Sequence, residues 1–231
     1  MTKRKIQYWV IPPDSDCEYV AAMEMILETY AQPYDASCPV ICMDEQPMQF
    51  QKEVRVPIPA TSNHAKRVDY EYERGGTASI FMFTEPLTGW RKATARLRRT
   101  KVDWAEEVKH LLTHDYTEAE RVILVSDNLN THTPGAFYEA FPPDEARSLL
   151  RRLEFRYTPK HGSWLNIAEN ELSALTRQCI GVRRIADLEI LCQEIQSWAS
   201  ARNAKQRGVD WQFKINDARV KLRSLYPKYL G

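Results

Sequence analysis

The sequence predicts an α/β fold in which early strands are followed by alternating helices and strands. Two apolar runs, 39–43 and 122–126, are each followed by an acid. Four or five apolar residues bounded by turn-forming residues predict a fully buried strand. Elsewhere apolar residues recur at helical spacing, as they do between Tyr19 and Tyr30, which predicts helices packed on one face of a sheet.

The first third of the chain predicts a helix and three strands. Ser15 with Glu18 three residues later forms a capping box, so we expect a helix over about 15–31. The strand 39–43 follows, and the proline-containing segment 46–67 predicts mostly loop. Two further strands, 77–84 and 90–97, flank Glu-Pro-Leu-Thr-Gly and predict a hairpin with a longer turn. In the second of them, small apolar residues alternate with basic ones, which predicts one core face and one basic face.

The rest of the chain predicts helices that alternate with two short strands. Asp103 and Glu106 form a second capping box, which predicts a helix from there to about His114. The remaining predicted elements are a buried strand before Asp127, helical segments within 134–151, a strand at 153–157, a helix from about 164 and a helix around Leu188–Trp198. We expect a single domain over 1–231, with an extra N-terminal helix and a basic C-terminal segment over about 201–231.

Composition is that of a soluble globular protein. The chain has 231 residues, of which 43% are apolar and 27% charged. No stretch approaches the roughly 20 apolar residues that a membrane helix needs, and the basic start is not followed by a signal-peptide core. The sequence therefore predicts a cytoplasmic protein without a membrane partner. The five cysteines include no Cys-x-x-Cys pair, so we expect reduced core residues and no zinc site.

The net charge of +1 hides two basic segments. Residues 91–101 hold six basic groups and no acid, and residues 201–231 hold eight basic groups against two acids. Such segments are either solvated faces or surfaces that bind nucleic acid. The sequence alone leaves both interpretations open.

Three acids occur where a metal-dependent nuclease requires them. Asp44 and Asp127 follow the two buried strands, and Glu169 lies near the start of a helix. Magnesium favours oxygen ligands, and strand ends hold carboxylates together because adjacent strands lie about 5 Å apart. The alternative is that each aspartate only caps a turn. Glu45 should point to the opposite face of its strand, so we set it aside.

Three segments resemble one family. Cys-Met-Asp-Glu (42–45), Ser-Asp-Asn-Leu-Asn-Thr-His (126–132) and Tyr-Thr-Pro-Lys-His-Gly-Ser-Trp-Leu-Asn-Ile-Ala-Glu (157–169) are similar to the catalytic domain of mariner-related bacterial insertion-sequence transposases. These are DDE enzymes with a ribonuclease H-like fold. The resemblance runs from about Ile6 to Pro227, and it implies a mixed five-stranded sheet flanked by helices.

The resemblance also favours one glutamate over its neighbour. Glu169 and Glu171 lie roughly 200° apart on a helix, so only one can face the sheet edge. In mariner-like relatives the third acid lies three residues after an asparagine, a spacing that Asn166 and Glu169 match. Two departures are the absence of a proline after Asn166 and a longer gap between Asp127 and Glu169. The implied catalytic and metal-binding set is Asp44, Asp127 and Glu169.

The implied function is DNA transposition. The resemblance implies hydrolysis at element ends, attack of a freed 3′-hydroxyl on target DNA, two Mg²⁺ ions per site with Mn²⁺ able to substitute, a homodimer on DNA and a location at the bacterial nucleoid. It also implies a helix-turn-helix region before the catalytic fold, whereas this chain begins almost at that fold. Alternatives are a ribonuclease H-like nuclease for branched nucleic acid, a degenerate fragment that only binds DNA or a partner transposase, and an unrelated acid-rich binding module.

Several residues are candidate DNA contacts. The basic face of the predicted second hairpin strand and its extension supply Lys92, Arg96, Arg98 and Arg99, and the loops beside the acids supply His132, Lys160 and His161. For His132 the alternative is a hydrogen-bonding loop histidine. Trp164 either stacks on a base or belongs to the core.

Overall fold

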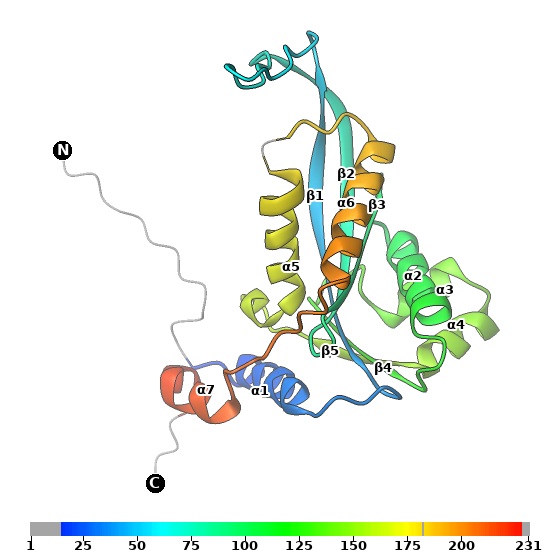
Figure 1. Ribbon diagram of the computed structural model, residues 1–231. Coiled ribbons are helices and arrows are strands. Elements are labelled where there is room, and N and C mark those ends of the chain that lie inside the picture. Colours follow the sequence, from blue (N-terminus) through cyan, green and yellow to red (C-terminus); the bar gives the residue numbers. More distant parts are fainter. Residues whose placement is uncertain (1–14, 182, 228–231) are drawn as a thin grey trace, which may run out of the picture.

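The protein folds around one mixed five-stranded sheet. The computed structural model describes residues 15–181 and 183–227 (Figure 1). The strands are β1 (Val40–Glu53), β2 (Tyr72–Glu85), β3 (Trp90–Arg96), β4 (Val122–Ser126) and β5 (Leu153–Tyr157). Their order in the sheet is β3-β2-β1-β4-β5. The hairpin strands β1, β2 and β3 pair antiparallel, whereas β4 pairs parallel to both β1 and β5. The predicted mixed five-stranded α/β sheet is confirmed.

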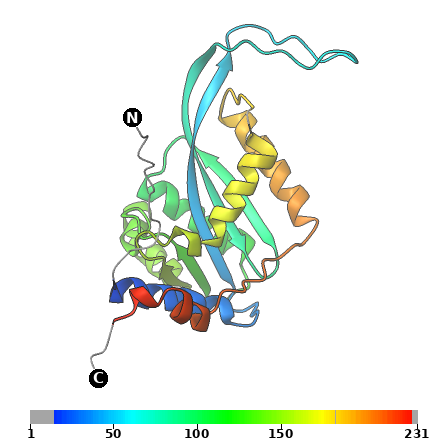
Figure 2. The ribbon, with the colours of Figure 1, turned by 90° about the vertical axis from the view of Figure 1, so that its left-hand side faces the viewer.

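Helices cover both faces of the sheet. They are α1 (Cys17–Ala31), α2 (Lys101–His110), α3 (Pro134–Ala140), α4 (Pro143–Arg151), α5 (Ile167–Leu175), α6 (Leu188–Asn203) and α7 (Ile215–Lys221). One core packs α1, α5, α6 and α7 against the sheet, and a second core packs α2, α3 and α4 against its other face. Successive residues of β1 alternate between them, with Cys42 in the first core and Met43 in the second. Figure 2 shows α5 and α6 side by side along the long strands.

The buried strand before Asp127 is confirmed. All five residues of β4 are buried, because this strand has a neighbour on each side and a helical layer on each face. Such strands consist of continuous apolar residues rather than alternating ones. The short strand predicted at 153–157 is β5 itself.

β1 is longer than its sequence predicts. Residues 46–53, predicted as loop, extend β1 and pair with β2, and Pro47 lies opposite Ser79. Pairing with β4 ends at Cys42, so beyond that point β1 has a neighbour on one side only, which is where a strand tolerates proline. The two long strands run past the helices into the connection 54–71, which projects from the body of the molecule (Figures 1 and 2).

Two helices begin at caps other than the predicted ones. Asp16, not Ser15, caps α1 by accepting a hydrogen bond from the backbone N–H of Tyr19. At α2 the capping box is formed by Thr100 and Asp103, so the helix begins at Lys101. It ends at His110 and continues as a single π-helical turn over Leu111–Asp115. In both cases a residue one to three positions away offers an equivalent side-chain acceptor, so spacing alone could not choose between them.

Parts of two predictions fall on residues that the structure does not describe. The predicted domain 1–231 includes residues 1–14, 182 and 228–231, and the basic C-terminal segment includes Lys228; these lie outside the described residues. Among the helices of residues 15–181 and 183–227, none combines the length and the apolar character needed to cross a membrane.

Candidate active site

The register between β1 and β4 brings two of the acids to neighbouring positions. Cys42 pairs with Val125 in the parallel ladder, and both side chains belong to the core beneath α5. Asp44 and Asp127 each lie two residues further along their chains, the interval after which side chains return to the same face. The two aspartates therefore follow neighbouring strands toward the α5 side of the sheet.

A buried asparagine fixes the start of α5 to β1. The side-chain amide of Asn166 donates to the carbonyl of Met43 at 2.8 Å, and its oxygen caps the helix by accepting from the N–H of Ala168 at 3.1 Å. The hydroxyl of Tyr30 donates to the carbonyl of Leu165 at 2.8 Å and holds the preceding turn. Asn166 thus ties the first turn of α5, which carries Glu169, to the residue just before Asp44.

The pKa of Asp44 is affected by its burial and by the charges of the other two acids. Burial, with smaller contributions from the charges of Asp127 and Glu169, raises the pKa of the Asp44 carboxyl to about 7. The N–H of Glu45, which donates to Oδ1 of Asp44 at 2.7 Å, and the nearby His132 act in the opposite direction. Asp44 therefore lies within electrostatic reach of both other acids, and burial is the main reason that its ionised form is disfavoured.

The donor set suits a hard divalent cation. Carboxylate oxygens are the ligands that Mg²⁺ prefers, and it binds through one or two of them together with water and substrate phosphate. A cation would also offset the burial and the smaller repulsion that together raise the pKa of Asp44. Within the described part of the chain, no three His, Cys, Asp or Glu side chains are placed to hold one ion together. The fit to the cation therefore rests on the chemistry of the carboxylates and not on a preformed three-ligand cluster.

Glu171 faces away from the acids. Its side chain is 6% exposed and lies between two arginines, with Oε2 at 2.9 Å from Nε of Arg91 and Oε1 at 3.2 Å from Nη2 of Arg202. Its negative charge is thus neutralised by these two arginines in the core between α5, β3 and α6. Of the two candidate glutamates, only Glu169 acts on the pKa of Asp44.

His132 links the second acid to the other face of the sheet. Its Nδ1 lies 2.7 Å from Oδ1 of Asp127, its Nε2 lies 3.1 Å from Oε1 of Glu45, and its ring stacks on Trp104. Burial acts to lower the pKa of His132, but hydrogen bonds to the two carboxylates and their charges outweigh it and raise the pKa to about 9. The ring is therefore a cation that donates to both acids.

This arrangement corrects the interpretation of two residues. The side chain of His132 is 0% exposed, so it has no surface with which to contact DNA in this structure, and it acts as a hydrogen-bonding residue instead. Glu45 does lie on the opposite face from Asp44, as predicted, but its buried carboxylate is a partner of the site through His132. In the sequence, the sign of this role is that Glu45 is an acid directly after Asp44.

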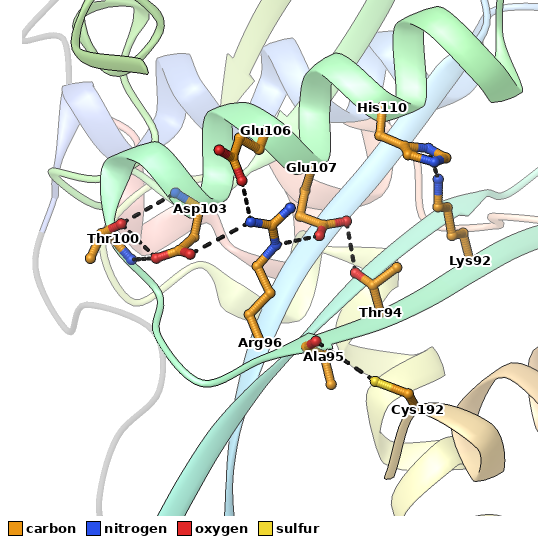
Figure 3. A network of polar contacts seen from close by, with 10 residues as sticks. All are labelled: Lys92, Thr94, Ala95, Arg96, Thr100, Asp103, Glu106, Glu107, His110 and Cys192. Carbon is orange, nitrogen blue, oxygen red and sulfur yellow. Dashed lines mark hydrogen bonds and ion pairs between the residues drawn. The ribbon is translucent and has the colours of Figure 1, made fainter. Parts of the chain in front are cut away.

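Most of the basic segment 91–101 is neutralised within the protein. Arg96 lies against the carboxylates of Asp103, Glu106 and Glu107 on α2, as Figure 3 shows. Lys92 contacts Asp115 at 2.5 Å, and Figure 3 shows its contact with His110. The expected basic face of β3 is therefore an internal charge network between β3 and α2.

The other candidate DNA contacts are at the surface. Arg98 and Arg99 are exposed between β3 and α2, and Lys160 and His161 are exposed in the turn before α5. His161 adopts a positive φ of 64°. Trp164 is half-buried, donates to the hydroxyl of Tyr19 at 2.9 Å and packs edge-on against Phe213, so it serves as a packing residue.

Comparisons with known proteins identify the family and the fold. The family model described as "DDE superfamily endonuclease" matches residues 39–192. The fold is similar to a pre-cleavage Mos1 transpososome (15% identity, TM-score 0.58, 99% of this chain and 69% of that chain). It is also similar to the Mos1 Strand Transfer Complex (16% identity, TM-score 0.55, 89% and 61%) and to the Mos1 mariner paired end complex with Mn (15% identity, TM-score 0.54, 87% and 60%).

The structural matches show a shared fold, and this chain spans about 60% of the length of the first Mos1 chain that it matches. A search of curated proteins found no match. The family model covers about two thirds of the chain and contains all three acids. The chain belongs to the DDE superfamily endonuclease family.

Proposed function

We propose that this chain is the catalytic domain of a DNA transposase that cleaves DNA at the ends of a mobile element and joins the freed 3′-hydroxyl to target DNA. The observation that supports the proposal is the β1–β4 register, which brings Asp44 and Asp127 to neighbouring strand ends, together with the bond from Asn166 that ties the first turn of α5, with Glu169, to β1. The charges of Asp127 and Glu169 also contribute to the raised pKa of Asp44. The fold shared with Mos1 complexes that contain element-end DNA supports the same substrate.

The proposed roles follow from where each side chain is held. Asp44 and Asp127 would bind or bridge two Mg²⁺ ions, for which Mn²⁺ can substitute, and Glu169 would complete the second position. Bound cations would activate the attacking oxygen and stabilise the leaving oxygen of an in-line displacement at phosphorus. Hydrolysis and strand transfer are both such displacements, so one set of acids can serve both.

The neighbouring residues would keep these acids in place. His132 holds one oxygen of Asp127 and leaves the other available to a cation. Asn166 holds the first turn of α5 against β1, so that Glu169 keeps its distance from Asp44. The proposal further includes action as a homodimer on DNA, as the resemblance to mariner-related enzymes implies, and a location at the bacterial nucleoid.

A cleavage assay tests the chemistry. The chain is incubated with DNA that carries the element ends, or with branched DNA, in the presence of Mg²⁺, Mn²⁺ or Ca²⁺. We expect nicking at element ends with Mg²⁺ or Mn²⁺ and none with Ca²⁺, whose looser coordination positions a nucleophile poorly. Asp127→Asn should abolish nicking, whereas Asp144→Asn, the same change at an exposed position on α4, should not.

Two outcomes would overturn the proposal. Equal nicking by Asp127→Asn and the parent chain would exclude catalysis by these acids. Cleavage of branched DNA with none at element ends would favour a structure-selective nuclease instead.

A further inference from the structure

A pocket of about 310 Å³ lies on the side of α5 that carries Glu171, away from Glu169, and is lined almost entirely by cations. Its walls are Arg91, Gln178, Arg202, Lys205 and Arg207. In the described part of the chain, the only acid that pairs with these cations is Glu171, which contacts both Arg91 and Arg202. Four positive groups therefore face one negative group, and the pocket has an excess of three positive charges.

On the inner side of the pocket, the side chains of Arg91, Arg202 and Gln178 are held by contacts within the protein. Arg91 is 2% exposed, its guanidinium lies against Glu171, and Nη2 also donates to the carbonyl of Arg207 at 3.3 Å. Arg202 stacks over the ring of Trp198, with its Cζ 5.3 Å from the ring centroid. Gln178 accepts hydrogen bonds through Oε1 from Trp198 and Arg202. These groups hold their positions without a ligand.

The outer wall is also held in place, although its side chains are exposed. The backbone N–H of Val209 donates to the carbonyl of Pro86 at 2.6 Å, and a Cβ on Gly208 would lie 2.4 Å from the carbonyl oxygen of Leu87. The segment that carries Lys205 and Arg207 is therefore packed against the turn between β2 and β3. Within residues 15–181 and 183–227, neither cation has an ion pair.

The size and position of the pocket indicate the class of ligand. A volume of about 310 Å³ is far larger than the roughly 10–15 Å³ that one water molecule needs, which leaves room for a sugar-phosphate unit and not only for a small ion. The pocket lies beside α5, the helix that carries Glu169. Figures 1 and 2 show that α5 and α6 lie side by side. Because an α-helix is about 10 Å across, one strand of nucleic acid can reach both sides of α5.

We propose that this pocket, formed by Arg91, Arg202, Lys205 and Arg207, binds a backbone phosphate of the DNA substrate other than the one that is cleaved. The proposal rests on the proposed function only in naming DNA as the nucleic acid. Arginine forks and lysine ammonium groups bind phosphate oxygens without regard to base sequence. This interaction would hold the strand while the acids act on a neighbouring phosphate.

Gln178→Glu is a sharp probe of the pocket. Its Oε1 can still accept from Trp198 and Arg202, so the fold is preserved, but the pocket gains a negative charge. Gln196→Glu is the matched control, because it makes the same change on an exposed residue of α6 that does not line the pocket. A second pair compares Lys205→Ala/Arg207→Ala with Arg147→Ala/Arg151→Ala, two exposed arginines on α4.

Binding to a labelled DNA duplex is measured by fluorescence anisotropy in EDTA over a range of salt concentrations. We expect Gln178→Glu to weaken binding several-fold while Gln196→Glu leaves it unchanged. Lys205→Ala/Arg207→Ala should lower the log–log salt slope by about 0.9 for each phosphate that is no longer neutralised, and the α4 double variant should not. Equal effects in the pocket and control variants would overturn the proposal, as would the absence of DNA binding by the parent chain.

The EDTA assay separates this proposal from the proposed function, because it requires no cleavage. If the parent chain cuts element ends but Gln178→Glu binds DNA as tightly as the parent, the pocket proposal falls and the transposase proposal stands. If DNA binding depends on the pocket but neither the parent chain nor any variant cuts DNA, the pocket proposal stands and the transposase proposal falls.

Discussion

The imidazole of His132 donates to Asp127 on one side and to Glu45 on the other, at 2.7 and 3.1 Å. The ring is fully buried, and the side chain of Glu45 is 3% exposed. A buried cation between two acids ties the end of β4 to β1 through the α2 side of the sheet. It thereby fixes one carboxylate oxygen of Asp127.

Removing His132 should therefore cost stability through Glu45. His132→Ala leaves the Glu45 carboxylate buried without a partner, and breaking a buried ion pair in this way costs about 3–5 kcal/mol. Neutralising the orphaned acid should recover part of that loss, so Glu45→Gln should be less harmful in the His132→Ala background than in the parent chain. Urea unfolding of the two single variants and the double variant gives the coupling free energy. Strict additivity would show that the two residues do not depend on each other.

The pKa of Asp44 predicts a pH-dependent effect of metal removal. The folded-state pKa of about 7 lies above the usual 3.8 of this group, so the folded state disfavours the ionised carboxyl. This penalty is absent below about pH 4, grows as the pH rises, and is complete above about pH 7. In EDTA at pH 8, Asp44→Asn should therefore have a higher Tm than the parent chain.

Magnesium should reverse that order. The parent chain should gain Tm when Mg²⁺ is added at pH 8, because a ligand that binds only the folded state stabilises it, whereas Asp44→Asn should gain little. At pH 4 the two proteins should have similar Tm values in EDTA. A parent chain that is more stable than Asp44→Asn at pH 8 without metal would contradict the electrostatic argument.

Asn166 should matter more for activity than its role as a helix cap suggests. Asn166→Ala removes the N-cap of α5 and leaves the carbonyl of Met43 without its donor. We expect a loss of about 1–3 kcal/mol in the free energy of unfolding together with a large fall in cleavage rate, because Glu169 loses its fixed distance from Asp44. Asp187→Ala is the control, since Asp187 caps α6 in the same way but is exposed. It should cost about 1 kcal/mol and leave the cleavage rate unchanged below the Tm.

The elements that carry the acids could be predicted from the sequence because their signals are local. Four consecutive apolar residues, Val122–Val125, precede Ser126 and Asp127, and the 3.6-residue period separates Glu169 from Glu171. The extension of β1 could not be predicted, because its residues become a strand only by pairing with β2. The ion pairs of Arg96 and the burial of His132 are likewise contacts between segments far apart in the chain. Residue type gives the charge of a side chain, but only the fold determines whether that charge is already neutralised.

Because the fold neutralises some of its charges, the basic segment 91–101 should contribute to DNA binding differently from what its sequence predicts. From sequence, replacing Arg96, Arg98 and Arg99 together should lower affinity for all DNA alike. The structure divides this set, because Arg96 is engaged by three acids of α2 while Arg98 and Arg99 are exposed. Arg98→Ala/Arg99→Ala should thus weaken binding and reduce the salt slope by up to about 1.8. Arg96→Ala should mainly lower Tm, because it leaves the buried Glu107 without a cation and with Thr94 as its hydrogen-bond donor.

The same variants test whether the chain binds by charge or by sequence. Phosphate contacts carry no base information, and base discrimination requires an element docked in a groove. The described surface cations that we can assign to DNA lie on a strand extension and on loops, so we expect equal losses of affinity for terminal-repeat and random DNA. Competition binding at fixed salt measures this directly. A preference of the parent chain for terminal-repeat DNA above about a hundredfold, approaching the range of specific readers, would mean that it recognises its own element ends unaided.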